Sequence, residues 1–74
     1  MSKHTLNFTR ERIGDGEIIQ RWNAGMWSIW HLRGGDYTLH AHSSPLPIAR
    51  RLTRRAAELL AQAMQDAIDL TGGH

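Results

Sequence analysis

The chain has 74 residues, no cysteine and a formal net charge of +2, and arginine supplies eight of its nine strong cations. These values exclude a scaffold held by disulfides and a zinc site built on cysteine, and they fit one small domain over residues 1–74. No apolar run approaches the roughly 18 residues of a spanning helix, and the start lacks the apolar segment of a signal peptide. We therefore expect a cytoplasmic protein with no membrane role.

The small size also bears on assembly. A domain of this length buries only about 60% of its unfolded surface, so it is marginally stable alone. Small domains without disulfides or metals commonly gain stability from a partner or a second copy. We therefore expect a homodimer.

The first part of the chain has the pattern of an antiparallel meander. Four short runs with strand-forming residues are separated by glycine-containing turns, which is typical of consecutive hairpins. The turns are GDG at 14–16, NAG at 23–25 and GG at 34–35. The predicted strands cover residues 5–13, 17–22, 26–32 and 37–42.

The third hairpin allows a register to be predicted. If Gly34 and Gly35 form a two-residue loop, Arg33 faces Asp36, and alternation then divides the side chains between two faces. The predicted core face carries Trp30, Leu32, Tyr37 and Leu39. The other face carries Trp27, Ile29, His31, Thr38, His40 and His42.

The last part of the chain is expected to be one helix over about 53–71. Two starts fit the prolines: either Ser44 caps a helix with Pro45 in its first turn, or 47–52 is extended and Thr53 is the N-cap. The second is preferred, because Pro47 disfavours helix at the residue before it. The apolar stripe expected to face the sheet is Leu52, Ala56, Leu59, Ala63, Ala67 and Leu70, widened by Leu60, Met64 and Ile68.

The predicted architecture is therefore α+β, a four-stranded antiparallel meander with one long C-terminal amphipathic helix on one face (ββββα). One helix covers only one face of a sheet. The other face is expected to expose Trp27, with Arg21 nearby. An aromatic and partly cationic surface suits base stacking with phosphate contacts, and it suits a protein interface equally well.

Motifs for catalysis or metal binding are weak. His31, His40 and His42 fall on one predicted face, but His-x-His is short and no carboxylate accompanies it, so we expect neither metal nor cofactor. Ser43 and Ser44 follow His42 without the strand-turn-helix setting of a nucleophile. We expect no enzymatic activity.

The strongest local feature is an arginine cluster beside the predicted helix start, formed by Arg50, Arg51, Arg54 and Arg55. A helix N-terminus already favours anions through its unpaired N–H groups and its dipole, so added guanidinium groups favour phosphate. An alternative needs no ligand. Two helices packed antiparallel would bring Arg54 and Arg55 of one copy toward Asp66 and Asp69 of the other.

These observations lead to two functional hypotheses. The first is a non-enzymatic, dimeric module that binds nucleic acid through Arg50, Arg51, Arg54, Arg55, Arg21 and Trp27. The alternative is a protein-interaction effector of phage or mobile-element type that docks on a host protein. In element order alone, the predicted fold resembles the Whirly-type and coactivator-type single-strand-binding folds, which are dimers that bind DNA on sheet faces. That resemblance identifies no binding residue in this chain.

Overall fold

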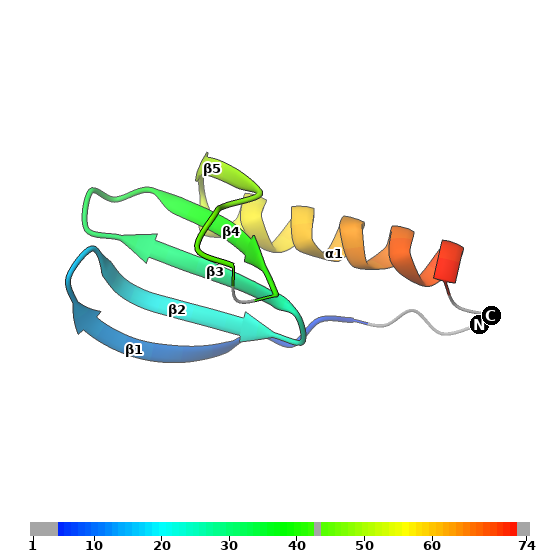
Figure 1. The fold of residues 1–74 in the computed structure, drawn as a ribbon, viewed down its shortest axis with the longest axis horizontal. Helices are drawn as coiled ribbons and strands as arrows, with labels where there is room; N and C mark the ends of the chain where they lie inside the picture. Colours follow the sequence, from blue (N-terminus) through cyan, green and yellow to red (C-terminus); the bar gives the residue numbers. More distant parts are fainter. Residues whose placement is uncertain (1–4, 43, 73–74) are drawn as a thin grey trace.

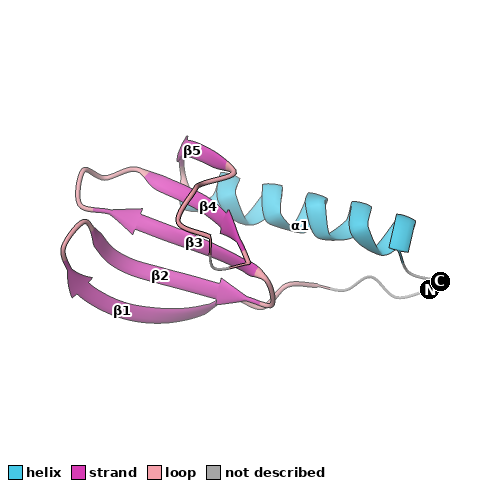
Figure 2. Ribbon diagram, in the orientation of Figure 1, coloured by secondary structure: helices cyan, strands magenta, loops and turns pink. Residues whose placement is uncertain are grey.

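The computed structural model describes residues 5–42 and 44–72, and it shows an α+β fold (Figure 1). An antiparallel sheet with strand order β1-β2-β3-β4-β5 is followed by one helix, which lies along one side of it (Figure 2). The elements are β1 Thr9–Asp15, β2 Ile18–Ala24, β3 Trp27–Leu32, β4 Tyr37–Ala41, β5 Ala49–Leu52 and α1 Arg54–Gly72. The predicted meander and helix are confirmed, but the predicted number of four strands was wrong, because Ala49–Leu52 pairs with β4.

The first two hairpins turn one residue later than expected. Asp15 pairs with Ile18, so the first turn is formed by Gly16 and the residue after it rather than by Asp15 and Gly16. In the second hairpin Ala24 pairs with Trp27. Gly25 follows Ala24 with φ of 59°, a left-handed conformation that glycine adopts without steric cost. Gly16 and Gly25 were therefore correct turn signals, although their places within the turns were not predicted, whereas Gly14 lies within β1.

The third hairpin corrects the predicted register. Leu32 N donates to Asp36 O at 2.8 Å, and Gly35 N donates to Leu32 O at 2.9 Å, so the loop has three residues instead of two. His31 consequently pairs with Tyr37. A shift of one residue reverses the faces of one strand relative to its neighbour. Trp27, Ile29 and Leu39 therefore share one face, and Trp30 shares the opposite face with Thr38 and His40.

Of the two helix starts that the sequence left open, the preferred one at Thr53 is found in the structure. Thr53 Oγ1 accepts the N–H of Ala56 at 3.1 Å, and Thr53 O accepts the N–H of Ala57 at 2.9 Å, so Thr53 is the N-cap and α1 begins at Arg54. Two residues before this N-cap, Arg51 has φ of 56°, which is uncommon for a residue with a side chain. This irregularity lies where the β4–β5 register shifts, and the chain there leaves the sheet for the helix.

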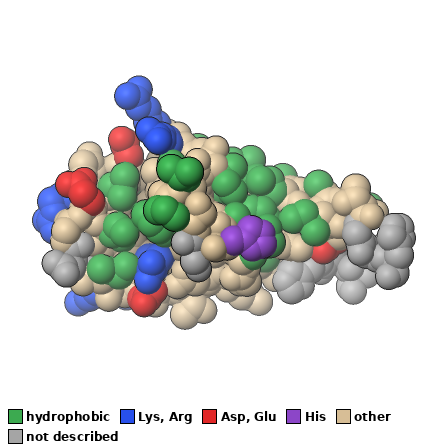
Figure 3. Space-filling model, viewed as in Figure 1, with side chains coloured by type: hydrophobic (Ala, Val, Ile, Leu, Met, Phe, Trp, Pro, Cys, Tyr) green, Lys and Arg blue, Asp and Glu red, His purple; other side chains and the backbone are tan. Residues whose placement is uncertain are grey.

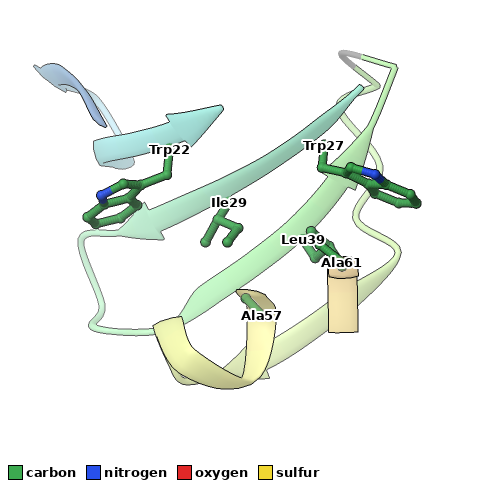
Figure 4. Packing of buried hydrophobic residues seen from close by; sticks show 6 residues of the cluster. All are labelled: Trp22, Trp27, Ile29, Leu39, Ala57 and Ala61. Atoms are coloured by element: carbon green, nitrogen blue, oxygen red, sulfur yellow. The ribbon is translucent and has the colours of Figure 1, made fainter. Parts of the chain in front are cut away.

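The core lies between α1 and the sheet face that carries Trp27 (Figure 4). Trp27, Ile29 and Leu39 are at most 1% exposed, and they meet Ala57 and Ala61, which are fully buried. Bulky side chains therefore come from the sheet and small ones from the helix, which lets the helix axis approach closely. We call this the helix-side face of the sheet and the opposite one the open face.

The side of α1 that meets the sheet differs from the predicted one. The residues turned inward are Ala57, Leu60, Ala61 and Met64, whereas Leu59 is 58% exposed and Leu70 is 78% exposed. Three members of the predicted stripe do pack against the core, namely Leu52, Leu60 and Met64. Its other members, Ala56, Leu59, Ala63, Ala67, Ile68 and Leu70, lie on the solvent side. The helix turns this side to the sheet because Ala57 and Ala61 fit more closely over the large Trp22 and Trp27 rings than a leucine does.

Contacts of α1 within the described residues run to β3, β4 and β5, so the helix-side face of β1 and β2 extends beside the helix rather than beneath it. Figure 1 shows the same arrangement, with the second half of α1 projecting past the sheet. In the described part of the chain, no helix is both long enough and apolar enough to cross a bilayer.

Candidate nucleic-acid interface

The four arginines predicted as a cluster lie in consecutive elements at one end of the helix. Arg50 and Arg51 belong to β5, Arg54 and Arg55 open α1, and all four are exposed. We call them the helix-start arginines. Because Thr53 caps only the N–H groups further along the first turn, those of Arg54 and Arg55 have no acceptor within the helix. The four arginines thus belong to the segment of chain at the positive end of the helix dipole.

Arg54 is the best-positioned of them. Its Cζ lies 5.4 Å from the centroid of the Trp22 ring, within the range of a cation–π contact. Its Nε lies 3.6 Å from Glu58 Oε2, an exposed pair within the helix that contributes little to stability. Arg54 therefore extends from the helix across the helix-side face of β2, where its side chain is still 54% exposed.

Two arginines outside the predicted cluster, Arg10 and Arg12, lie on the helix-side face with Arg54. Glu11 of β1 contacts Arg21 on the open face, so alternation turns Arg10 and Arg12 to the helix side. Arg10 pairs with Trp22, the residue beneath Arg54. The signal was present in the sequence as Arg-Glu-Arg at strand spacing, which segregates the two cations from the anion. We call Arg10, Arg12 and Arg54 together the arginine face. Arg50 does not belong to it, because Ala49 pairs with Leu39 on the helix side and alternation turns Arg50 to the open face.

Aromatic rings lie under the arginine face but are largely covered. Trp22 is 7% exposed, and its ring centroid lies 5.8 Å from that of Tyr37. Tyr37 is stacked on His31 at 4.3 Å, with 3° between the ring planes. The Nδ1 atom of His31 is buried and has no hydrogen-bond partner among the described residues. The Trp22 ring contacts the Arg54 guanidinium, but Trp22 is too deeply buried to stack with a base.

Arg21 does not join this face. Its Nε donates to Glu11 Oε1 at 3.0 Å on the open face, and Asn23 Nδ2 donates to the same oxygen at 3.0 Å. These bonds hold the pKa of the Glu11 carboxyl below its ordinary value, because they stabilise the charged form. The charge of Arg21 is therefore locally compensated. Arg21 lies on the open face as expected, but its neighbour there is Trp30 and not Trp27.

The open face is organised by hydrogen bonds. Ser28 Oγ donates to Asn23 Oδ1 at 2.9 Å and accepts from Trp30 Nε1 at 3.0 Å. Trp30 is stacked on His40 with ring centroids 3.7 Å apart. A shallow pocket of about 300 Å³ lies over Arg21, Asn23, Ser28 and Trp30 near the β2–β3 turn. Its polar groups already satisfy one another, so it presents few unused donors to a ligand.

His40 is a structural residue within this network. Nε2 lies 2.7 Å from Thr38 Oγ1, and Nδ1 lies 3.0 Å from Ser44 O. A carbonyl can only accept, so Nδ1 carries the proton and Nε2 accepts from the hydroxyl. Burial lowers the pKa of His40, against an opposing effect of its backbone hydrogen bonds, and favours the neutral ring.

Two predictions about site residues were wrong. Trp27 is 1% exposed, and its Nε1 donates to Gln65 Oε1 on α1 at 2.8 Å, so it joins the sheet to the helix instead of facing solvent. His31 and His40 lie on opposite faces, and His42 follows β4 in a turn with φ of 58°. Within residues 5–42 and 44–72, no group of three His, Asp or Glu side chains is placed to hold a metal ion.

Charge is separated along α1 but mixed over the sheet. In the view of Figure 3, Lys, Arg, Asp and Glu side chains all lie over the sheet half, while the projecting part of the helix shows mostly hydrophobic side chains with some acidic surface. Asp66 and Asp69 lie in that projecting half.

Three comparisons with known proteins give no match: no family model, no curated protein and no solved structure matches this chain.

Proposed function

We propose that this protein is a non-enzymatic module that binds nucleic acid through the arginine face. The observation that carries the proposal is the position of Arg54, held over Trp22 between the helix start and the arginines of β1. Arginine presents several N–H donors to phosphate oxygens, and a row of such groups matches a repeating anion better than a single one.

The chemistry favours contact with the phosphate backbone over reading of bases. The arginines are exposed, whereas Trp22 is almost fully covered. Backbone contacts position a nucleic acid without specifying its sequence, so we expect weak sequence preference. Affinity should fall steeply as salt rises, because each neutralised phosphate releases counterions.

The proposal includes a homodimer, since a domain of this size gains stability from a second copy. Two copies would also double the number of arginine faces available to one polyanion. The surface that joins the copies is argued in the next subsection.

A protein-interaction effector is the second candidate, and a specific observation favours it. The segment that connects β4 to β5 exposes Leu46 by 73% and Ile48 by 44%. Exposed apolar side chains of this size are typical of contacts with other proteins. An effector of phage or mobile-element type would use this apolar segment, and its binding would depend little on salt.

The test is fluorescence anisotropy with labelled single- and double-stranded oligonucleotides at low and physiological salt. Arg12→Gln should weaken binding and reduce the slope of log affinity against log salt by about one. Arg21→Gln removes the same charge from the open face and is the matched control, which should leave both nearly unchanged. The double variant Arg12→Gln with Arg54→Gln should weaken binding further.

Two results would overturn the proposal. If no oligonucleotide binds at low salt, the arginine face is not a nucleic-acid site, and the effector becomes the better explanation. If Arg21→Gln weakens binding as much as Arg12→Gln does, the contact surface is the open face. Circular dichroism of each variant verifies that the fold is retained.

A further inference from the structure

The solvent side of α1 carries an apolar stripe formed by Ala56, Leu59, Ala63, Ala67 and Leu70, which we call the outer stripe. Its members recur at steps of three and four, so they line one side of the helix. Leu59 and Leu70 are 58% and 78% exposed, while Ala57 and Ala61 on the inner side are fully buried. Within the described residues, α1 packs against the sheet by its inner side, and Leu6 N donates to Gln62 Oε1 at 2.8 Å, while every member of the outer stripe is exposed.

The order of sizes in the outer stripe makes it complementary to itself. When two copies cross antiparallel with Ala63 at the two-fold axis, Leu59 meets Ala67 of the second copy, and Leu70 meets Ala56. Each large side chain thus faces a small one, and the alanine at the centre permits close approach of the backbones. A two-fold interface requires this reciprocity, because the same patch serves both copies.

The charges of the helix specify the same orientation. Its first turn has no acidic residue and its last turn has no basic one, the reverse of what the helix dipole favours. Antiparallel pairing brings the arginines of one helix start toward Asp66 and Asp69 of the other copy, while parallel pairing would bring like charges together. Arg55 and Asp66 lie on the same flank of the outer stripe, and Gln62 Nε2 donates to Asp66 Oδ1 at 3.0 Å.

We propose that a second copy of this chain docks on the outer stripe, with the two α1 helices antiparallel. This inference rests on the homodimer within the proposed function but does not depend on nucleic-acid binding. The contact is one helix wide and buries less than the roughly 1,600 Å² of a standard interface. We therefore expect a dissociation constant in the micromolar range.

Sedimentation velocity over a series of concentrations from low to high micromolar tests the surface. The native chain should change from monomer to dimer over this range. The Leu59→Glu variant should stay monomeric at every concentration, since the substitution places a charge in the contact between the two outer stripes. Leu46→Glu is the matched control, because Leu46 is an exposed leucine away from α1, and this variant should dimerise like the native chain.

A charge exchange tests the orientation. Arg55→Glu and Asp66→Arg should each weaken the dimer at least several-fold, and the double variant should recover most of the loss, because antiparallel copies exchange both partners. A well-folded double variant that stays as weak as the single variants would overturn the antiparallel arrangement. Unaltered dimerisation of Leu59→Glu, or a native chain that is monomeric at every concentration, would overturn the surface.

The two proposals can fail separately. Leu59→Glu leaves the arginine face intact, so a monomeric variant should still bind a short oligonucleotide with the native salt dependence. If the native chain dimerises as expected but binds no oligonucleotide, the dimer stands and the nucleic-acid proposal is overturned. Circular dichroism of dilute Leu59→Glu shows whether its monomer remains folded.

Discussion

Trp27 and Trp30 lie three residues apart on β3, yet they belong to two differently constructed faces. Trp27 is buried under α1, and its indole N–H reaches Gln65, 38 residues away in the chain. Trp30 is partly exposed, and its indole N–H reaches Ser28, two residues away on the same strand. The helix-side face is therefore held by apolar packing between distant segments, and the open face by hydrogen bonds between near neighbours. We expect the first to dominate global stability and the second to respond to pH.

The largest effect should come from truncating the helix-side tryptophan. Trp27→Ala removes a fully buried ring and its bond to the helix, and we expect a loss of about 3–5 kcal/mol in the free energy of unfolding. Urea denaturation followed by circular dichroism measures it. Trp30→Ala is the control and should cost clearly less. Equal losses would show that the two faces contribute alike.

Overpacking the same face should have the next largest effect. Ala61→Leu inserts volume where the helix is closest to the sheet, and we expect a loss of about 1–3 kcal/mol. Ala63→Leu makes the same change on the solvent side and should alter stability by about 0.5 kcal/mol or less in dilute protein. Thermal denaturation of both variants makes the comparison. If Ala61→Leu leaves the melting temperature unchanged, close approach of the helix to the sheet is not required.

The open face should be the more sensitive to acid, through His40. Burial lowers the pKa of its folded form below the ordinary value of 6.5, so the unfolded chain binds the proton more readily. The stability that the neutral ring contributes is complete above pH 6.5 and declines as the pH falls through the lower pKa of the folded form. Urea midpoints at a series of pH values should show this decline.

His40→Gln supplies the control for that experiment. It should be less stable near neutral pH and should lose part of the dependence on acid. His42→Gln, which changes an exposed imidazole, should keep the native dependence. If His40→Gln declines with acid as steeply as the native chain, the dependence arises from another group.

The smallest effect should come from the exposed edge of the open face. Glu11→Gln removes the charge that Arg21 and Asn23 bind, and we expect only a slight decrease in melting temperature because solvent screens this pair. The low pKa of Glu11 contributes stability above its ordinary value of 4.5, and this is lost as the pH falls below that value. A decrease as large as that of Trp27→Ala would contradict the assignment of stability to the helix side.

The sequence predicted correctly those features that depend on a few adjacent residues. Glycines at the turns, the capping hydroxyl of Thr53 and the extended segment after Pro47 depend on a few adjacent residues, and the structure agrees with each of them. The helix and the meander follow from the same kind of evidence. The helix-start arginines lie in adjacent elements because they are close in sequence, but sequence proximity did not show that Arg50 and Arg54 turn to different faces of the sheet.

Properties that depend on tertiary packing were not predictable in the same way. The glycine pair at 34–35 allows a loop of two or three residues. Because the loop has three residues and the prediction assumed two, Trp27 and His31 lie on the face opposite to the predicted one. The helix has apolar residues on two sides, so periodicity did not show that Ala57 and Ala61, rather than Leu59, face the rings of the sheet. Arg10 and Arg12 joined the candidate site only through the pairing of β1 with β2.

The separation of charge along α1 has a consequence for the length of nucleic acid that two copies could engage. With Ala63 at the axis, the two helix starts would lie about 27 Å apart along the pair, at 1.5 Å per residue. A fragment shorter than this span would occupy one end at a time, whereas a longer one would bridge both and gain from its high effective concentration at the second end. Apparent affinity should then rise abruptly with oligonucleotide length, a threshold that a monomer would lack.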